Sequence, residues 1–540
     1  MAKRALDRGT ACLFCRKRKV KCDGGRPACR RCHEMGRAED CEYNDPQARS
    51  ENEHLESSIA RLEARIRQLG GTLPTSPEVI LHEPHLEGQP LGSFSFSSWS
   101  IQRPHQAPPT RLQVTLSDGW WRTPIPPPNV TKILIEFFAR HASQFGFFLN
   151  GPRIVKSVFS PDARRPIFPR LLNGILLFGI NLSGSPALQA HENVFLARVQ
   201  QSSTLSNAVQ PYHIVQNIQA EALLAQYFLR QGRFLEAMHH INAAASLSIG
   251  CGLRRLNGHH SERNAYPLPS TRDAVEQGER VNAFWSIMAA HKVFSVMMQW
   301  PSSVSDILDE QVDLPWPLDM EVYDSGIVPV NPHGQSTMKS FVEDPMSANF
   351  EAANSTLAQH AKAAALFERA SHMGGQRASN LSDPDEQAQF TSFEHGLNQF
   401  MQTLPPFNGQ GTIDTIRLRL VTFTLCQVAI IQLHSAFDNP ASIHKCLNAA
   451  RAVAWEHVDS TMGTLWVAVC QVIIRGIATI KNPRSSSRGW AASVSNADYP
   501  ALNMALKSLI GTMSTFAPRC LLIDYQLNKV QETYKTLAGR

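Results

Sequence analysis

The sequence contains little that would carry the chain into or across a membrane. Residues Met1 to Ala11 are polar and basic, and they lack the apolar core of a signal peptide. The longest apolar stretch, Leu171 to Leu182, is interrupted by Asn173, Gly174 and Gly179, and it is shorter than the ~20 residues that a membrane helix needs. We therefore expect a soluble intracellular protein with reduced cysteines and no membrane partner.

Motifs of the common enzyme classes are also missing. The chain has no phosphate-binding glycine loop, no zinc-protease helix and no nucleophile elbow. The pairs His239-His240 and His259-His260 have no further metal ligands at a suitable spacing, so we interpret them as surface residues. We expect no enzymatic activity. Outside the N-terminal region the cysteines are scattered and are interpreted as core residues, namely Cys251, Cys426, Cys446, Cys470 and Cys520.

Basic residues are concentrated near the N-terminus. The net charge of +6 is modest for 540 residues, but between Arg16 and Arg31 the only acidic residue is Asp23. The same stretch holds eight basic residues, which are Arg16, Lys17, Arg18, Lys19, Lys21, Arg26, Arg30 and Arg31. Such a local excess predicts binding to a polyanion.

Six cysteines in this region follow the pattern C-x2-C-x6-C-x6-C-x2-C-x8-C. Each half begins with C-x2-C, a spacing that lets two thiolates on one turn reach the same metal ion with tetrahedral geometry. If six sulfurs hold two four-coordinate zinc ions, two of the cysteines bridge both ions. The thiolates and ions together carry a charge of about −2, which the surrounding cations more than offset. The predicted ligands are Cys12, Cys15, Cys22, Cys29, Cys32 and Cys41.

Two alternatives remain open for this cluster. One zinc ion held by the two C-x2-C pairs would leave Cys22 and Cys41 free and the internal repetition unexplained. A cluster without metal would require six closely spaced thiols in a segment too small to bury them. We therefore predict two zinc ions per chain, Zn(2+) being the cofactor.

A heptad pattern begins at residue 55 and predicts a dimerisation helix. Its leucines fall at d and its isoleucines at a, the combination that favours a parallel two-stranded coiled coil. Asn52 would set the register from the preceding a position, whereas Glu51 and Glu56 would mildly repel across the dimer. An amphipathic surface helix is the alternative, because little more than two heptads is marginal. The seam, predicted to form a homodimer, consists of Leu55, Ile59, Leu62, Ile66 and Leu69.

The chain is predicted to be all-α and to divide at changes of composition. Residues 1–45 form the zinc cluster, 46–54 a connector, 55–70 the coiled coil, 71–118 a flexible linker, and 119–540 a large helical domain. Apolar residues recur at helical spacing after the Pro126 to Pro128 breaker. The stretches Val215 to Leu229 and Ala237 to Leu247, ended by Gly232 and Gly252, predict two antiparallel helices.

The cysteine region closely resembles the fungal zinc binuclear cluster transcription regulators. The resemblance runs from Cys12 to about Tyr43, and Pro27 matches the proline of the loop that joins the two halves. It implies that Cys12 and Cys29 bridge the zinc ions. The remaining cysteines would complete one site each in pairs, Cys15 with Cys22 and Cys32 with Cys41.

The same resemblance implies that the basic run reads DNA. In the family the basic helix after the second cysteine enters the major groove, and the lysine three positions before the third cysteine reads a CGG-type triplet. That lysine is Lys19 here, and Arg18 is the next candidate. Arg16, Lys17 and Lys21 are expected to contact phosphates. A solvated helix face or a nuclear localisation signal would have the same composition.

The helical region resembles the regulatory domain of the same family over a short signature. Arg280 to Pro301, which contains Trp285, is followed by the tail Asp313 to Pro315. The family usually carries a glycine just before that proline, where this chain has Gln299 and Trp300. The resemblance implies an α-helical regulatory domain.

These features predict a nuclear RNA polymerase II transcription regulator. It would bind double-stranded DNA as a zinc-dependent homodimer and read CGG-type triplets. The helical domain would contact transcription coregulators or bind a small-molecule effector. A zinc-stabilised protein-interaction scaffold is the alternative, but such a module has no need of the cationic helix. An enzyme in the helical domain would require clustered catalytic groups, which the sequence does not show.

Overall fold

The computed structural model describes residues 11–36, 38, 41, 79–82, 111–114, 119–160, 166–201, 213–255, 268–299, 312–328, 337–338, 341, 355–376, 384–406, 412–453 and 462–537. The chain forms two compact units, Met1–Pro77 and Glu78–Arg540, and each is described by itself. The predicted connector at 46–54 lies outside the described residues, as does the coiled-coil seam of Leu55, Ile59, Leu62, Ile66 and Leu69.

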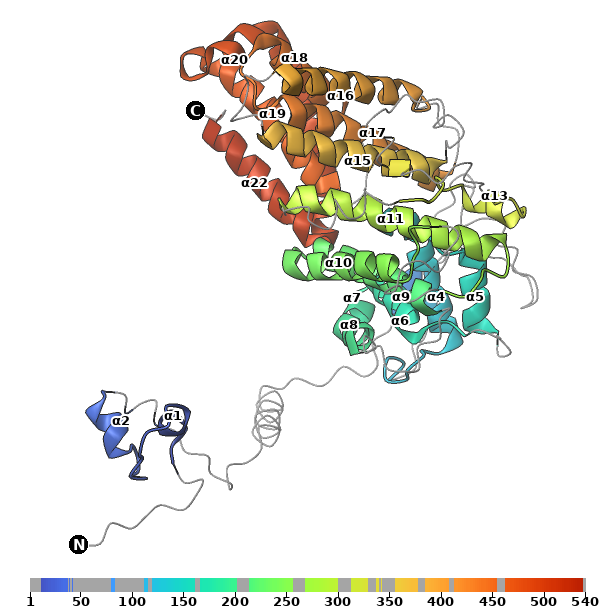
Figure 1. Ribbon diagram of the computed structural model, residues 1–540, viewed down its shortest axis with the longest axis vertical. Coiled ribbons are helices and arrows are strands. Elements are labelled where there is room, and N and C mark those ends of the chain that lie inside the picture. Colours follow the sequence, from blue (N-terminus) through green and yellow to red (C-terminus); the bar gives the residue numbers. More distant parts are fainter. Residues whose placement is uncertain are drawn as a thin grey trace. The chain divides into compact units, whose positions relative to one another are not determined.

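The described part of the first unit contains two helices of five residues each. They are α1 (Leu13–Lys17) and α2 (Arg30–Glu34), drawn in blue in Figure 1. Helices this short are unstable alone, because nucleation costs more free energy than one turn recovers. Their apolar cluster consists of cysteines with Phe14 and Ala28 at its edge. Bonds made through the cysteines are therefore needed to hold this unit together.

In the described part of the second unit the regular elements are helices except for one pair of short strands, which confirms the predicted all-α fold class. Its elements are β1 (Val79–His82), β2 (Arg111–Val114), α4 (Pro128–Ala139), η1 (Ala142–Phe145), α5 (Gly151–Phe159), α6 (Pro169–Leu182), α7 (Pro186–Gln189), α8 (Glu192–Gln201), α9 (His213–Arg230), α10 (Phe234–Gly250), α11 (Ala274–Met298), α13 (Met320–Asp324), α15 (Thr356–Gln376), α16 (Pro384–Thr403), α17 (Ile413–His434), α18 (Pro440–Ala452), α19 (Met462–Lys481), η3 (Pro483–Ser485), α20 (Arg488–Ser493), η4 (Asn496–Asp498), α21 (Tyr499–Phe516), η5 (Ala517–Arg519) and α22 (Leu521–Leu537).

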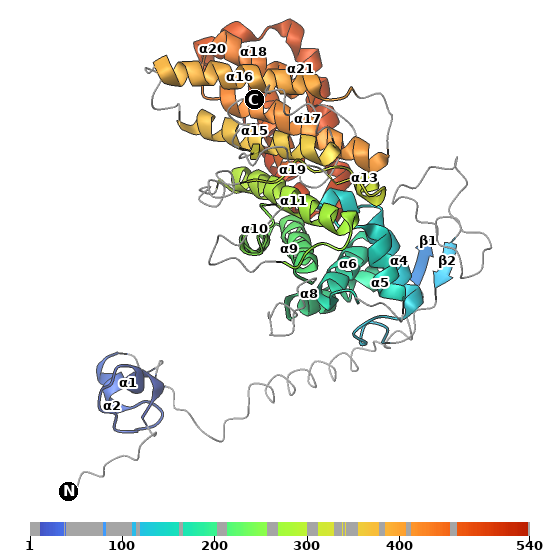
Figure 2. The same cartoon turned by 45° about the vertical axis from the view of Figure 1, so that its right-hand side comes forward.

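The strand pair lies within the segment that composition assigned to a flexible linker. β1 and β2 run antiparallel, with Val79 opposite Val114 and His82 opposite Arg111 (Figure 2). Each strand is only four residues long, which is the lower limit at which an alternating pattern can be recognised. The rest of the predicted linker at 71–118 lies outside the described residues.

The long helices form a stack in which each packs on the next. α9 packs on α10, α10 on α11, α11 on α15, and α15 on α17 (Figure 1). α9 and α10 are the predicted helix pair, and the short connection between them contains Gly232 at φ +69. α10 ends at Gly250, and Gly252 follows at φ +78. Only glycine adopts these left-handed conformations without strain, so the sequence correctly located both helix ends.

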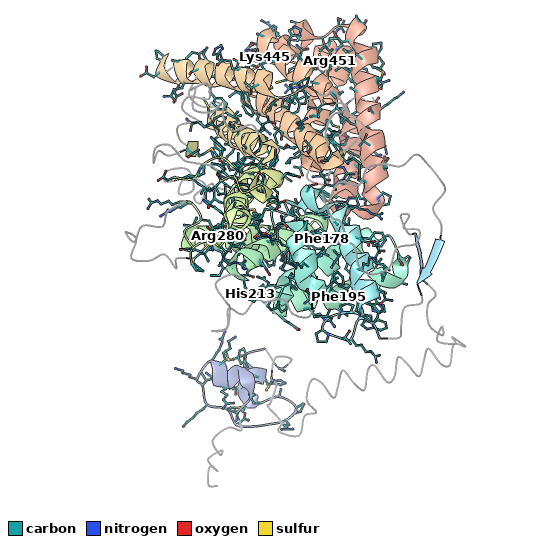
Figure 3. The ribbon with its side chains drawn as sticks, turned by 90° about the vertical axis from the view of Figure 1, so that its right-hand side faces the viewer. Phe178, Phe195, His213, Arg280, Lys445 and Arg451 are labelled. Atoms are coloured by element: carbon teal, nitrogen blue, oxygen red, sulfur yellow. The ribbon has the colours of Figure 1, made fainter. Side chains whose placement is uncertain are left out.

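α4 and α6 pack against each other at very short range. A Cβ atom added to Gly179 of α6 would lie 2.3 Å from the carbonyl oxygen of Leu134 of α4. Beside this contact the ring of Phe178 lies 4.4 Å from that of Phe145 and 6.1 Å from that of Phe138, measured between centroids. Phe178 lies among the helices in Figure 3. The glycine therefore sets the distance at which this aromatic core forms.

A buried ionic network joins α6, α9 and α10. Arg170 Nη1 donates to Glu221 Oε1 at 2.5 Å, and His240 Nδ1 lies 2.7 Å from Glu221 Oε2. The prediction of surface histidines is therefore wrong for His240, which is buried because a carboxylate inside a core needs charged or hydrogen-bonded partners. His239 is exposed as predicted, and His259-His260 lies outside the described residues.

α11 joins the two parts of the predicted regulatory signature. Trp285 Nε1 donates to the carbonyl oxygen of Pro315 at 2.8 Å, and its ring stacks on Trp316 at 4.3 Å between centroids. The helix ends at Met298, and its C-cap residue Gln299 has a left-handed φ of +52. Glycine adopts this conformation without strain, whereas glutamine does not. Trp300 and Pro301 lie outside the described residues.

Two further helices, α17 and α19, are long and apolar enough to cross a membrane by length and composition. Within the helical unit, 56% and 61% of their apolar windows are buried. α17 packs on α15, α18 and α19, and α19 packs on α21 and α22. Both helices are apolar because much of their surface is buried against other helices of the unit. The prediction that the scattered cysteines are core residues is confirmed, because Cys251, Cys426, Cys446, Cys470 and Cys520 are all buried.

Candidate metal centre and nucleic-acid interface

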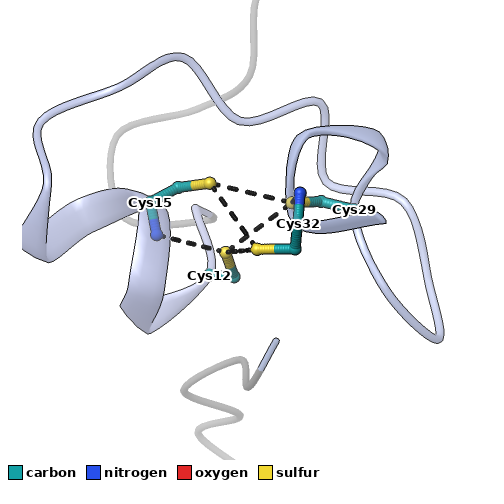
Figure 4. Close-up of side chains that lie close together, drawn as sticks. All are labelled: Cys12, Cys15, Cys29 and Cys32. Atoms are coloured by element: carbon teal, nitrogen blue, oxygen red, sulfur yellow. Dashed lines mark hydrogen bonds between the residues drawn. The ribbon is translucent and has the colours of Figure 1, made fainter. Parts of the chain in front are cut away.

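Cys12 and Cys29 each cap the start of a short helix. The backbone N–H of Cys15 donates to Cys12 Sγ at 3.4 Å, and the N–H of Cys32 donates to Cys29 Sγ at 3.3 Å. In both halves the C-x2-C spacing turns the second thiol back toward the first, so that four sulfurs converge (Figure 4). The second pair follows the first by 17 residues. The two halves are therefore structural repeats.

The four converging sulfurs lie at distances that suit tetrahedral zinc. Cys12 Sγ is 3.8 Å from the sulfurs of both Cys29 and Cys32, and Cys15 Sγ is 3.7 and 4.0 Å from the same two. A zinc ion with four sulfurs at about 2.3 Å has sulfur–sulfur edges of about 3.8 Å. These four cysteines are also the ligands of the one-zinc alternative. The positions of Cys22 and Cys41 therefore distinguish a site for one zinc ion from a site for two.

Cys22 and Cys41 both lie beside Cys29. Cys41 Sγ accepts the backbone N–H of Cys29 at 3.1 Å and also interacts with the Cys12 thiol. The potential ligand atoms of Cys22, Asp23 and Cys29 lie within 4.8 Å of one another. The structure thus gathers all six cysteines. Cys29 lies beside Cys22 of one predicted zinc site and beside Cys41 of the other. This position suits the bridging role that the resemblance implies for Cys29.

The donor set also fits zinc by its acid–base chemistry. Burial raises the pKa of Cys12 to about 12 and also raises the pKa of Cys29. In the absence of a cation these thiols would therefore be protonated at neutral pH. A divalent cation reverses this balance because it stabilises the thiolates that coordinate it. Clustered thiolate donors at tetrahedral distances are the ligands that structural zinc prefers.

Both helices are followed by a residue in the left-handed conformation at the same position, but the residue differs. After α1, the N–H groups of Lys19 and Val20 donate to the carbonyls of Arg16 and Cys15 at 3.2 and 3.1 Å, which forms a Schellman turn. The left-handed position of this turn is Lys19, at φ +54. The equivalent position after α2 is Gly36, at φ +65. A side chain is strained in this conformation and glycine is not, so the first half keeps Lys19 at a cost in stability.

The predicted DNA contacts form an exposed cationic surface at the end of α1. Arg16 and Lys17 lie in its last turn, Arg18 is its C-cap residue, and Lys19 and Lys21 follow beyond the helix. The basic run is therefore only partly helical, in contrast to the single basic helix that the resemblance implied. A helix that continued at 1.5 Å per residue would carry the next cysteine away from the cluster.

In the second half of the unit, both arginines of α2 lie beside a carboxylate. On α2, Arg30 Nε lies 2.9 Å from Glu34 Oε1 and Arg31 Nη1 lies 3.8 Å from Glu34 Oε2. Glu34 occupies the place in this half that Lys17 occupies in the first. Among the described residues, the five cations at the end of α1 make no ion pair with a carboxylate. Within the described residues, positive charge without an ion-pair partner therefore gathers at the end of α1.

Asp23 has a structural role that the sequence analysis did not assign. Its carboxylate accepts the backbone N–H of Arg30 at 3.0 and 3.3 Å. This bond ties the segment after Cys22 to the start of α2, where a negative charge is favourable. The signal was present in the sequence, because Asp23 is the only acidic residue between Arg16 and Arg31.

Residues 10–50 match the family described as the Fungal Zn(2)-Cys(6) binuclear cluster domain. This match confirms the resemblance for the N-terminal domain. Together with the gathered cysteines it also confirms the predicted cofactor, two zinc ions per chain. The family match ends at residue 50, so the regulatory role of the helical region stays a prediction.

The chain is also similar to three curated fungal proteins. It is 23% identical over 299 residues to the notoamide biosynthesis cluster transcriptional coactivator notQ' of Aspergillus versicolor, across 54% of this chain and 53% of that protein. It is 36% identical over 84 residues to the depudecin biosynthesis cluster-specific transcription activator DEP6 of Alternaria brassicicola, across 15% and 13%. It is 58% identical over 40 residues to the sorbicillinoid biosynthetic cluster transcription factor sor3 of Hypocrea jecorina (strain QM6a), across 7% and 6%.

The matches span about half the length of the first relative and less of the other two. These names describe transcription factors, which are generally not enzymes. No solved structure matches the chain.

Proposed function

We propose that this protein, whose residues 10–50 match a fungal binuclear zinc cluster domain, is a nuclear transcription regulator that recognises duplex DNA by sequence. The zinc cluster holds the end of α1 in place, and Lys19 reads a CGG-type triplet in the major groove. Lysine and arginine donors suit the O6 and N7 acceptors of guanine. The regulated promoters are those of RNA polymerase II.

The asymmetry between the two halves of the cluster is the observation that carries this proposal. The halves share their cysteine caps and their terminal turns, yet a strained lysine stands where the repeat has Gly36. Strained backbone positions tend to persist where the residue has a function. A scaffold that only binds proteins would gain stability from glycine at Lys19. The retained ammonium therefore supports a role in recognition.

The other cations of the surface hold the domain on the DNA backbone. Lys17 and Arg16 are exposed in the last turn of α1, and Lys21 is exposed in the irregular segment that follows. Contacts to phosphates position a protein on the duplex but carry no sequence information. Arg18, whose guanidinium lies 5.0 Å from the centre of the Phe14 ring, is oriented by that contact and is a second candidate for base reading.

A homodimer is part of the proposal. One triplet is a short site, and a second linked head acts at a high effective concentration, so paired half-sites are bound more tightly. The dimer would form through the predicted seam of Leu55, Ile59, Leu62, Ile66 and Leu69. The large helical unit then contacts transcription coregulators. The names of the three relatives support regulation of a biosynthesis cluster.

DNA binding by the full chain tests this proposal. Affinity for a duplex with paired CGG-type triplets and for a scrambled duplex of equal length is measured by fluorescence anisotropy over a salt series. Lys19→Ala is expected to weaken binding to the triplet duplex by about 1–3 kcal/mol and to leave the scrambled duplex nearly unchanged. Lys17→Ala is expected to weaken both alike and to lower the salt slope by about one.

Arg30→Ala is the matched control, because this arginine is exposed but paired with Glu34. It is expected to have little effect on either duplex. Equal affinity of the unmodified chain for both duplexes would support the scaffold alternative instead. Zinc content is measured on the same samples. Chelation is expected to abolish DNA binding and added zinc to restore it, and a stoichiometry of one ion would contradict the binuclear assignment.

A further inference from the structure

The helical unit contains a cavity that the proposed function does not use. Its volume is about 370 Å³, which lies within the range of small-molecule sites, roughly 300–1,000 Å³. The segment from Ala139 to Pro152 forms one wall, and residues of α9, α11, α13, α15, α17 and α19 form the others. All of these elements belong to the second compact unit.

Most of the wall is apolar, and three phenylalanines contribute to it. Phe147 and Phe148 contribute from the loop, Ala290 and Phe294 from α11, and Val421 from α17. Apolar and aromatic walls of this kind bind flat or compact hydrocarbon surfaces. The size and lining of the cavity therefore favour a small aromatic ligand.

Two amide side chains in this wall each carry an oxygen without a hydrogen-bond partner among the described residues. Gln226 of α9 and Asn282 of α11 both line the cavity and are 8% and 6% exposed. Gln226 Oε1 and Asn282 Oδ1 are buried acceptors that receive no hydrogen bond within the described part of the chain. An unsatisfied buried acceptor destabilises a fold, whereas a leucine or methionine of similar size would not. A ligand that donates hydrogen bonds would remove this penalty.

The charges around the cavity are mostly negative. Arg417 is the only cation in its lining, and it lies 3.7 Å from the carboxylate of Asp414. The other acidic residues of the lining are Asp319, Glu321 and Asp324. A negative rim repels anions during entry and binding. The ligand is therefore expected to be uncharged.

We propose that this cavity binds a small, uncharged, hydroxylated aromatic compound whose hydroxyl groups donate to Gln226 and Asn282. The ring occupies the apolar wall beside Phe294, and the hydroxyl groups satisfy the two buried acceptors. The site rests on the cavity alone. Its test contains no DNA, so failure of triplet reading and failure of this site are separate outcomes.

Binding of 2-naphthol to the full chain, measured by isothermal titration calorimetry, tests the site. This probe has an aromatic body and one hydroxyl donor, which is matched to Asn282 and leaves Gln226 unsatisfied, and it is neutral at pH 7. We expect one saturable site per chain. 2-Methoxynaphthalene, which has the same body without the donor, is expected to bind about tenfold more weakly. The anion 2-naphthoate is expected to bind more weakly than 2-naphthol.

Variants of the wall tie the binding to this cavity. Asn282→Leu is expected to lower the affinity for 2-naphthol about tenfold while binding of the methyl ether is unchanged. Asn173→Leu is the matched control, because Asn173 Oδ1 is also a buried acceptor without a partner but does not line the cavity. Ala290→Phe fills the cavity and is expected to abolish binding of every probe. If thermal unfolding shows that this variant is misfolded, the smaller Ala290→Leu replaces it.

Five results would overturn the proposal. The first four are the absence of saturable binding of 2-naphthol, equal affinities for 2-naphthol and its methyl ether, tighter binding of 2-naphthoate, and binding that a folded Ala290 variant leaves unchanged. Loss of 2-naphthol affinity in Asn173→Leu equal to that in Asn282→Leu would also contradict it. Unchanged affinity in Asn173→Leu with a tenfold loss in Asn282→Leu supports the site.

Discussion

Replacing Lys19 with glycine separates the recognition role of its side chain from its backbone cost. Lys19 has a φ of +54, a conformation that costs a residue with a Cβ atom roughly 1–2 kcal/mol relative to glycine. Glycine loses more backbone entropy on folding, which offsets part of this gain. We therefore expect Lys19→Gly to stabilise the folded zinc cluster by about 1 kcal/mol, a factor of about five in its folding equilibrium.

Competition for zinc with a chelator measures this effect, because metal binding and folding of so small a domain are coupled. Lys19→Gly is expected to retain zinc against about five times more chelator than the unmodified chain. Lys19→Ala keeps the Cβ atom and is expected to gain nothing. Both variants lose the ammonium group, so both are expected to lose the preference for the triplet duplex by the same factor.

Gly36→Ala is the converse control. Gly36 has a φ of +65, and a Cβ atom added there would meet no other atom within 4 Å. Strain is therefore the only expected effect, a loss of about 1 kcal/mol with DNA preference unchanged. If Lys19→Gly retains zinc no better than Lys19→Ala, the strain argument is wrong. If Lys19→Gly still prefers the triplet duplex, Lys19 does not read bases.

Three further predictions concern the helical unit and are checked by thermal or denaturant unfolding. Gln299→Gly, at a φ of +52, is expected to raise the free energy of unfolding by about 1 kcal/mol, and an equal gain in Gln299→Ala would contradict a backbone origin. Gly179→Ala is expected to lower it by about 1–3 kcal/mol or more, because the new Cβ would lie 2.3 Å from a backbone carbonyl oxygen. Gly511→Ala, where nothing lies within 4 Å, should instead be neutral or slightly stabilising, and similar losses at both glycines would refute the packing argument. Burial lowers the pKa of His291 to about 4 from its ordinary 6.5, so the unfolded chain takes up the proton first as the pH falls. The stability is complete above about pH 6.5 and declines toward pH 4 with a slope of about 1.4 kcal/mol per pH unit from this residue. His291→Gln should remove that part of the slope, and an unchanged pH profile would show that His291 is not buried in its neutral form.

Local chemistry made the zinc cluster predictable. The C-x2-C spacing brings Cys12 to Cys15 and Cys29 to Cys32 within one helical turn, so convergence of the thiols needs no distant contact. The residue at which α1 ends was harder to predict from the sequence. A run of lysine and arginine favours helix as far as Lys21 by propensity, yet the helix ends at Lys17, because the chain must turn back to the cluster.

The helical unit shows the same division. The pair α9 and α10 was predicted with its ends, because apolar periodicity and Gly232 are local signals. The strands β1 and β2 were missed, because four residues are too few to reveal a period. His240 was assigned to the surface, because no residue near it in the chain indicates its contact with Glu221.

The sequence by itself therefore determined the zinc cluster, the helical class and the cationic run, since each depends on residues close together in the chain. The tertiary structure alone decided that His240 is buried, through its contact with Glu221 on another helix. It also decided that Gly179 must be a glycine, through the approach of α4. The cavity with Asn282 in its wall arises from helices far apart in the sequence. Contacts of that kind depend on how whole elements pack, and no local pattern of residues encodes them.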